Sequence, residues 1–249
     1  MLFARYAYPP NALGYCGPAD PAALLGTAGE GGDRRELRHL AAQFEGAWPY
    51  LQLIAASNGL ADPLDRAVVE AYWVGNALLG HVRPADLHAS LDARFRRRAG
   101  GRFGALAEAV PAGAIPQHNF HVFGVYPWLG LLRAGMEGAP LEVLDRCRIR
   151  WGRVEEVAGD WVTVSSRPLV FEGSRLRLGP PRPEPARCRI DDASLVGPLE
   201  TGEIVSLHWD WVCDRLTDAS QRWLRYCTRR NLGAVNATAR PGPAAACGA

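Results

Sequence analysis

The sequence predicts an α+β protein, with a mostly helical region over residues 1–140 and a small OB-like β-barrel with a C-terminal helix over residues 145–236. Apolar residues recur at intervals of three and four through the first region, which is typical of amphipathic helices. After Pro140, apolar and polar residues alternate over short stretches separated by glycine and proline, which is typical of short antiparallel strands. Residues 237–249 are rich in alanine, glycine and proline and are predicted to be disordered.

Composition limits the classes of function. A chain of 249 residues can form one large domain or two small ones, and its net charge of +2 gives no reason to expect nucleic acid or an anionic membrane as a partner. No stretch approaches the roughly eighteen consecutive apolar residues of a membrane span, and the N-terminal residues lack the pattern of a signal peptide. The six cysteines form no CxxC motif or regular spacing, so neither a zinc ribbon nor a disulfide framework is expected. We therefore expect a cytoplasmic protein with reduced thiols.

The helical region begins with an aromatic and proline-rich segment over residues 3–18. Its prolines and glycines oppose a long regular element, so it is expected to pack as an irregular strap. Glycine-rich residues 29–32 are expected to form a flexible break. A helix is predicted from Asp33 onward, where apolar residues recur at helical spacing. A second is predicted to begin at Asp62-Pro63, with Asp62 as N-cap, and a third at Pro84.

One candidate site lies near the end of the helical region. His118 and His121 are spaced so that one face of a helix would present both imidazoles, and a metal site would need further donors. The thiol of Cys16 is one candidate, although no pattern in the sequence places it nearby. The alternatives are buried imidazoles that hydrogen-bond the backbone, or an aromatic-rich packing surface.

The strand region is predicted to open with a hairpin whose turn is Gly159-Asp160. Further strands are predicted over residues 169–171, 174–178, 187–190 and 204–208, with a proline-rich loop over 180–185. A helix is expected after Thr217 or Asp218, either of which is a natural N-cap.

A second candidate site joins two strings that lie about sixty residues apart. Cys147 lies at the start of a strand pattern, and His208 ends a later strand. A thiolate and an imidazole are suited to a soft or borderline transition metal such as iron. The neighbouring residues that are expected to support this site are Trp209, Asp210, Trp211 and Cys213.

The residues around these strings resemble a known family. The string Cys147-Arg-Ile-Arg-Trp-Gly-Arg-Val154, then Gly202-Glu203, the strand ending in His208, and the run from Asp214 to Ala219 follow the order found in HypC-type (HupF-type) chaperones of NiFe hydrogenase maturation. The resemblance covers about ninety residues, a little over a third of the chain.

This resemblance implies an accessory protein rather than an enzyme. HypC-type proteins work with a partner iron–sulfur protein to assemble and hand over an iron centre that carries cyanide and carbon monoxide. Cys147 would be the thiolate ligand of transiently bound iron, and His208 a second ligand or an outer hydrogen-bond donor. The expected partner is a maturation factor or a hydrogenase-type large subunit, and no other cofactor is implied.

The chain departs from the family pattern in three places. Residues 1–146 precede a cysteine that is N-terminal in the family, Trp151 stands where the family has proline, and Trp209-Asp-Trp-Val212 replaces Gly-Phe-Ala. The alternatives are therefore a buried core thiol at Cys147 and a structural histidine at His208 that hydrogen-bonds Asp210. The Trp-Asp-Trp cluster would close a pocket or face the helical region.

Two other classes of function stay open. The first is a metal- or thiol-dependent enzyme whose site lies in the helical region or in the cleft between the regions, formed by Cys16, His118 and His121. The sequence contains no P-loop, Rossmann glycine motif, nucleophile elbow or HExxH, so its reaction class is undefined. The second is a binding module without a metal, in which the barrel serves protein contact alone.

Overall fold

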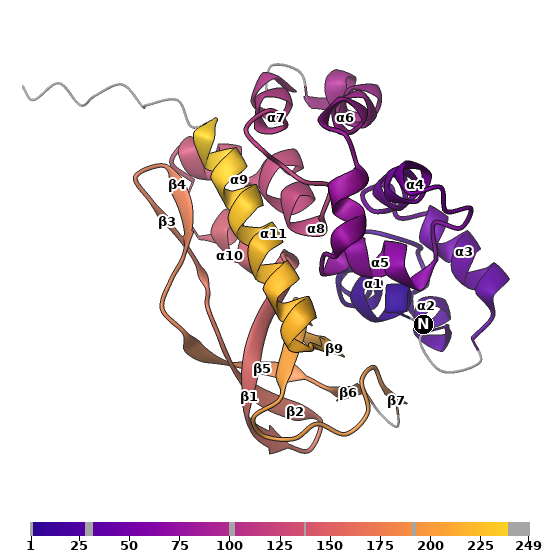
Figure 1. Cartoon of the computed structure of the whole chain (residues 1–249). Helices are drawn as coiled ribbons and strands as arrows, with labels where there is room; N and C mark the ends of the chain where they lie inside the picture. Colours follow the sequence, from indigo (N-terminus) through magenta and orange to yellow (C-terminus); the bar gives the residue numbers. More distant parts are fainter. Residues whose placement is uncertain (1, 28–31, 100–102, 137, 191–192, 239–249) are drawn as a thin grey trace, which may run out of the picture.

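The computed structural model describes residues 2–27, 32–99, 103–136, 138–190 and 193–238 (Figure 1). Helices fill the first part of the chain, strands follow, and one long helix ends the described residues. The predicted α+β class is therefore confirmed.

Short helices make up the N-terminal half. The first eight are α1 (Leu2–Ala12), α2 (Pro21–Gly26), α3 (Arg34–Ala42), α4 (Trp48–Ser57), α5 (Arg66–Trp73), η1 (Ala77–His81), α6 (Pro84–Ala99) and α7 (Phe103–Ala109). After them come α8 (His118–Phe120), the π-helix η3 (His121–Val125), α9 (Trp128–Arg133) and α10 (Ala139–Cys147). The C-terminal helix is α11 (Asp218–Ala237), capped by the Thr217 side chain.

The expected irregular strap is wrong, because residues 2–12 form helix α1. Pro9 and Pro10 lie in its last turn, where they remove only the bonds that their N–H groups would make to carbonyls four residues earlier. Phe3 and Tyr6 are buried at 1% and 0% exposure, and their burial holds the helix against the core.

Two of the three predicted helix starts are confirmed. Asp33 caps α3 by accepting a hydrogen bond from the Arg35 N–H, and Pro84 opens α6. The third start is displaced: Asp65 caps α5, whereas Asp62 accepts from the Leu64 N–H in the preceding turn. Of the expected break over 29–32, all but Gly32 lies outside the described residues, as does most of the tail over 237–249.

Five strands form a ring with the order β1-β2-β5-β9-β8. They are β1 (Arg150–Ala158), β2 (Trp161–Ser166), β5 (Arg182–Arg187), β8 (Ile204–His208) and β9 (Trp211–Arg215). Their ladders are antiparallel except between β5 and β9, which meet at the single parallel pair Arg187 and Trp211. Separate two-stranded ladders join β3 (Leu169–Glu172) to β4 (Arg175–Leu178) and β6 (Arg189–Ile190) to β7 (Ala193–Ser194). The sequence predicted an OB-like barrel, and whether this ring of strands is OB-like stays a prediction.

The predicted proline-rich loop over 180–185 is wrong, since most of it belongs to strand β5. Pro183 and Pro185 pair in register with Ser165 and Thr163 of β2. The opposite edge of β5 joins another strand only at Arg187, so the missing proline N–H groups remove no ladder bond on that side.

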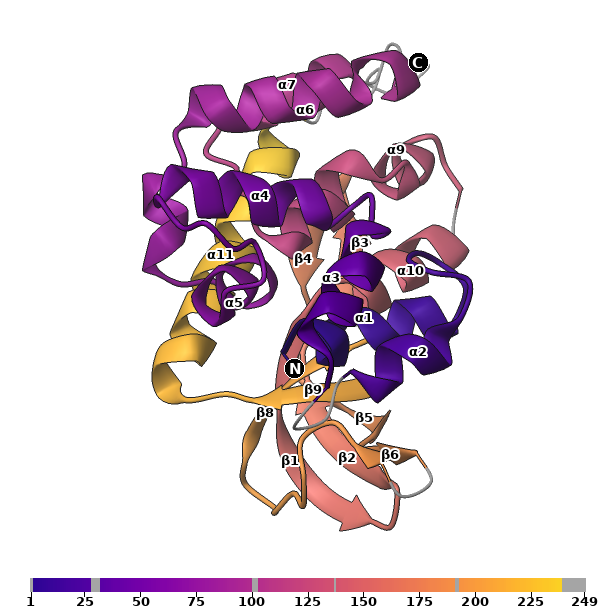
Figure 2. The same ribbon diagram turned by 90° about the vertical axis from the view of Figure 1, so that its right-hand side faces the viewer.

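One continuous cluster of buried hydrophobic residues extends from α1 through the strands to α11. Helix α11 lies along α7, α8, η3 and β4, and α1 packs on β8 and β9 (Figures 1 and 2). The expected division at residues 140–145 falls within α10 and stays a prediction. Within the described ranges, none of the helices combines the length and hydropathy of a membrane span.

Candidate metal centre

Three donor side chains meet between the helices and the strand ring. His118 begins α8, Cys147 ends α10, and His208 ends β8. One donor atom from each lies within 4.8 Å of the other two, and the side chains are only 5%, 5% and 0% exposed. The structure thus brings Cys147 and His208 together and adds His118. Cys147 ends a helix, whereas the sequence pattern placed it at the start of a strand.

The orientation of His208 is set by helix α1. Its Nδ1 donates a 2.6 Å hydrogen bond to the backbone carbonyl of Tyr6, since a carbonyl can only accept. The Tyr6 hydroxyl also pairs with Ser206, at 2.7 Å. Residues 206 and 208 share one face of β8 because side chains alternate along a strand. Tyr6 therefore holds this face through both its hydroxyl and its backbone, and Asp210 is not the partner of His208.

The carbonyl of Tyr6 is open to His208 because of Pro10. In a regular helix the N–H four residues later would bond this carbonyl, and proline has no N–H. With Nδ1 protonated, the lone pair of neutral His208 lies on Nε2, which is buried without a hydrogen-bond partner. The nearby carbonyl of Cys147 instead accepts from His118, at 2.9 Å. Burial lowers the pKa of His208 well below its ordinary value, which keeps the ring neutral.

His118 has partners on both ring nitrogens. Its Nε2 donates to the Cys147 carbonyl, so its Nδ1 is the acceptor for the Tyr72 hydroxyl, at 3.1 Å. The same hydroxyl lies 3.5 Å from the carbonyl of Gly46, a second acceptor. His118 Nδ1 is therefore available to another ligand once Tyr72 turns to Gly46. Burial lowers the pKa of His118 to about 4.

The chain around Cys147 is held from two directions. Arg150 donates to the carbonyls of Asp145 and Arg146 in the last turn of α10, and also to the carbonyl of Trp209. The Trp209 N–H donates to the Arg146 carbonyl at 2.7 Å. The end of α10 is thus fixed to the β8–β9 turn. Burial raises the pKa of the Cys147 thiol above its ordinary value, and Arg150 opposes this rise.

Polar side chains beside His118 also fix the site. Asn119 exchanges hydrogen bonds with both backbone groups of Ile149, two residues after Cys147. Gln117 donates to the carbonyl of Trp73. Gln117 and Asn119 are both 0% exposed, and Asn119 also donates to the Thr228 hydroxyl on α11, so the two amides together join α8 to α5, Ile149 and α11.

The three donors fit a transition-metal ion. In a tetrahedral site with bonds of about 2.0–2.3 Å, the donors lie about 3.3–3.8 Å apart. Side-chain movements of about 1 Å therefore close the observed group to bonding distance. One thiolate and two imidazoles suit soft and borderline ions such as zinc, iron and cobalt. The bond from His208 Nδ1 to a carbonyl is the contact that commonly orients a metal-binding histidine.

The three donors line a cavity that adjoins a second, larger hollow. A cavity of about 180 Å³, here called the inner cavity, is lined by His118, Cys147, His208 and Trp209 together with Cys16 and His121. A larger hollow of about 870 Å³, the outer hollow, is also lined by Cys16 and His121. Both candidate sites of the sequence therefore meet around one cavity. His121 does not share a three-donor group with His118 as the i, i+3 spacing suggested.

The other residues expected to support the site have different positions. Trp209 lines the inner cavity in a left-handed conformation with φ +54°, and its indole stacks on Tyr15 at 4.3 Å between ring centroids. Trp211 packs edge-to-face on Tyr8. Cys213 is buried in β9, with its thiol 3.7 Å from the Trp211 carbonyl. Neither Trp211 nor Cys213 lines the cavity.

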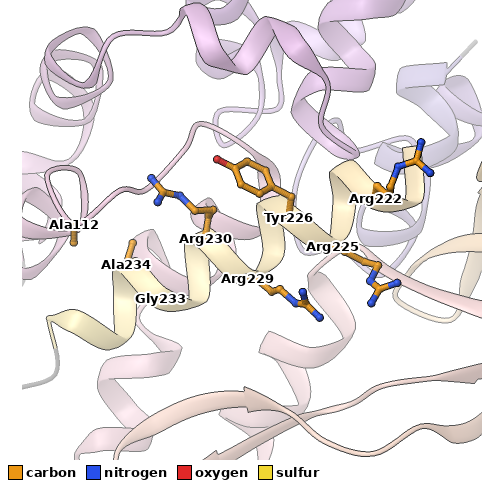
Figure 3. A pocket seen from close by; sticks show the side chains of 8 residues that line it. All are labelled: Ala112, Arg222, Arg225, Tyr226, Arg229, Arg230, Gly233 and Ala234. Atoms are coloured by element: carbon orange, nitrogen blue, oxygen red, sulfur yellow. The ribbon is translucent and has the colours of Figure 1, made fainter. Parts of the chain in front are cut away.

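A separate hollow lies on α11 and is rich in arginine (Figure 3). Arg225 and Arg229 extend from one side of the helix, whereas Arg222, Tyr226 and Arg230 extend from the other (Figure 3). Their guanidinium groups do not converge, and this hollow contains no thiol, imidazole or carboxylate. Its lining therefore offers none of the donors that a soft or borderline metal ion prefers.

Sequence reasoning missed Tyr6, Tyr72 and Asn119. Tyr6 and Tyr72 stand among other aromatic and apolar residues, where they are typical of core. The uninterrupted polar run of Gln117, His118 and Asn119 between apolar segments was an available signal, because such residues need partners when buried.

The fold and this group define an α+β protein with a buried His–Cys–His donor set between its helices and its strand ring. The chain belongs to the Family of unknown function (DUF6390), whose model matches residues 1–241. No curated protein and no solved structure matches the chain.

Proposed function

We propose that this protein is an accessory protein of metal-centre assembly, which binds a transition-metal ion through His118, Cys147 and His208 and passes it to a protein partner. The observation that carries the proposal is the buried, unpartnered Nε2 of His208 beside a thiol and a second imidazole. Buried polar atoms in proteins almost always have a partner. A soft or borderline metal ion is a partner that engages the imidazole and the thiol together.

The resemblance to HypC-type chaperones extends this proposal to the cargo. The ion would be iron that carries cyanide and carbon monoxide, and the receiver a maturation factor or a hydrogenase-type large subunit in the cytoplasm. The described cysteines are all free thiols, in keeping with a reducing compartment. The metal is cargo here, and the three side chains bind and release it without transforming a substrate.

The geometry favours protected storage. The donors lie in a small cavity in contact with aromatic rings, with Trp73 4.6 Å from His118 and 5.6 Å from His208 between ring centroids. Such surroundings exclude bulk water, which limits exchange of bound ligands with solvent. Cys147 is fixed in a helix end, unlike the terminal cysteine of HypC-type proteins, so release depends on the access route to the inner cavity.

The test is metal analysis and infrared spectroscopy of the protein after co-expression with the maturation partner. We expect about one iron per chain with cyanide and carbon monoxide bands, and loss of both in Cys147→Ser and His208→Ala. Cys188→Ser is the matched control, since Cys188 lies outside the inner cavity. Full retention of iron in Cys147→Ser would falsify the ligand assignment.

A second candidate function is a metal- or thiol-dependent enzyme. It is favoured by the outer hollow, which has room for an organic substrate beside Cys16 and His121. The two functions differ in the fate of the metal. A carrier loses its ion to the partner during incubation, whereas an enzyme retains it, so the metal content of the re-isolated protein distinguishes them.

A further inference from the structure

Cys16 and His121 lie between the surface and the metal group, which is the set of donors His118, Cys147 and His208. Both line the inner cavity and also the larger outer hollow. Cys16 is half-buried, whereas the side chains of the metal group are almost wholly buried. A cation entering from the outer hollow therefore meets Cys16 and His121 before it reaches Cys147.

The position of Cys16 is built by specific contacts. The Asn11 amide donates to the carbonyls of Cys16 and Pro18, at 2.9 and 2.7 Å. Gly17 has φ +92°, and a Cβ there would lie 2.3 Å from the ring of Phe44. The loop therefore requires glycine after Cys16, since a side chain would meet both backbone strain and a steric clash. These contacts hold the thiol at the junction of the two hollows.

His121 supplies an independent sign of a missing ligand. Its side chain is 3% exposed, and its Nδ1 is buried without a hydrogen-bond partner. On the other side of the ring, a Cβ on Gly46 would lie 2.8 Å from Nε2, so glycine leaves space for the imidazole. His121 begins a π-helix, an element that is frequent at functional sites. A buried nitrogen with no partner and a thiol therefore line the same two hollows, and imidazole and thiolate are the ligands that a soft or borderline metal ion prefers.

We propose that Cys16 and His121 form a transfer site, where a soft or borderline divalent metal ion binds before it passes to His118, Cys147 and His208. This inference rests on the proposed function, because it requires the inner group to be the destination. In the transfer, the bond from the metal to Cys16 breaks as the bond to Cys147 forms. The thiol proton of Cys147 moves to the Cys16 sulfur, so no electron is exchanged and no proton must leave the cavity.

The experiment is rapid mixing of the metal-free, full-length protein with Co²⁺, followed by the charge-transfer absorption between thiolate and cobalt. The variants are Cys16→Ser and His121→Gln, with Cys188→Ser as the matched control. We expect the first two to load about tenfold more slowly, because each removes a ligand of the transfer step. All three are expected to reach the final stoichiometry and spectrum of the natural protein.

Loading of Cys16→Ser and His121→Gln at the natural rate overturns the transfer site. A lower final stoichiometry in Cys16→Ser also overturns it, because Cys16 would then belong to the resident site. Failure of the proposed function has a different signature: the natural protein takes up no cobalt, or Cys147→Ser gives the natural spectrum. Circular dichroism of each variant establishes that it is folded before its rate is compared.

Discussion

The imidazole of His208 donates a hydrogen bond to the backbone carbonyl of Tyr6, which lies 202 residues earlier in the chain. This contact fixes the tautomer in which Nε2 carries the lone pair. The Tyr6 carbonyl is free to accept this bond because Pro10, four residues later in the helix, has no N–H to donate to it. The end of the first helix is therefore part of the candidate metal centre, although it contributes no donor atom.

Replacing Pro10 by alanine is expected to weaken metal binding. The new N–H competes with His208 for the Tyr6 carbonyl, which loosens the orientation of the imidazole. Loss of such an orienting contact typically costs about ten- to a hundredfold in affinity, and competition for the carbonyl should give about tenfold. Zinc titration against a chromogenic chelator measures the change. Pro9→Ala is the control, because the carbonyl it affects is that of Arg5; equal affinities in the two variants would contradict the role of Pro10.

Tyr72→Phe is expected to strengthen metal binding and to destabilise the metal-free protein. The Tyr72 hydroxyl occupies Nδ1 of His118, so its removal frees a ligand atom but leaves a buried nitrogen unpaired. The metal-free protein should lose about 1 kcal/mol of unfolding free energy. Chelator competition and urea unfolding measure the two effects. Tyr226→Phe is the control, since Tyr226 is 49% exposed and lies outside the inner cavity. Weaker metal binding in Tyr72→Phe would count against the assignment of Nδ1.

Stability of the metal-free protein is expected to fall with pH on the acid side of neutrality. Burial lowers the pKa of His118 to about 4, and it holds the pKa values of His121 and His208 well below 6.5. Between about pH 6.5 and pH 4 the unfolded chain binds more protons than the folded one, so the unfolding free energy decreases as pH falls.

For His118 alone the loss across this window is about 3 kcal/mol. Urea unfolding at about pH 7 and about pH 4.5 checks the direction. The variant His118→Gln should show a shallower dependence. An equal slope in this variant and in the natural protein would mean that folding does not lower the pKa of His118.

At position 209, glycine is expected to be more stabilising than alanine. Both Trp209→Gly and Trp209→Ala lose the indole and its stacking on Tyr15, so they differ only in the backbone. The left-handed conformation at φ +54° costs alanine about 1 kcal/mol more than glycine. Urea unfolding of the two variants gives the difference directly, and equal stabilities would show that the turn relaxes when the indole is removed.

Hydrophobic periodicity was sufficient to predict the class of the fold and the helix that follows Asp33, and Pro84 was sufficient to predict the start of α6. Capping chemistry placed the start of α5 at Asp62, whereas Asp65 is the cap. Two of the misassigned elements, α1 and β5, contain prolines. In each, the missing N–H removes a bond that tertiary structure does not need: His208 uses the Tyr6 carbonyl, and one edge of β5 is largely open. That compensation comes from contacts distant in sequence, which local patterns do not contain.

The sequence was sufficient to predict the kind of donor side chains in the candidate site, but only partly which residues form it. Cys147, His208 and His118 were selectable as soft and borderline donors. Their grouping depends on α10 ending at Cys147 and on a π-helix beginning at His121, which removes His121 from the regular α-helical spacing. Neither boundary has a strong local signal.

The hydrogen bond between Tyr6 and His208 also has a consequence for biosynthesis. During translation the first helix leaves the ribosome long before the strand that carries His208 has been made. The imidazole cannot be oriented until that strand has emerged and folded back on residues synthesised at the beginning. The three donors of the candidate metal centre are therefore brought together only late in synthesis, and a nascent chain does not present the complete set.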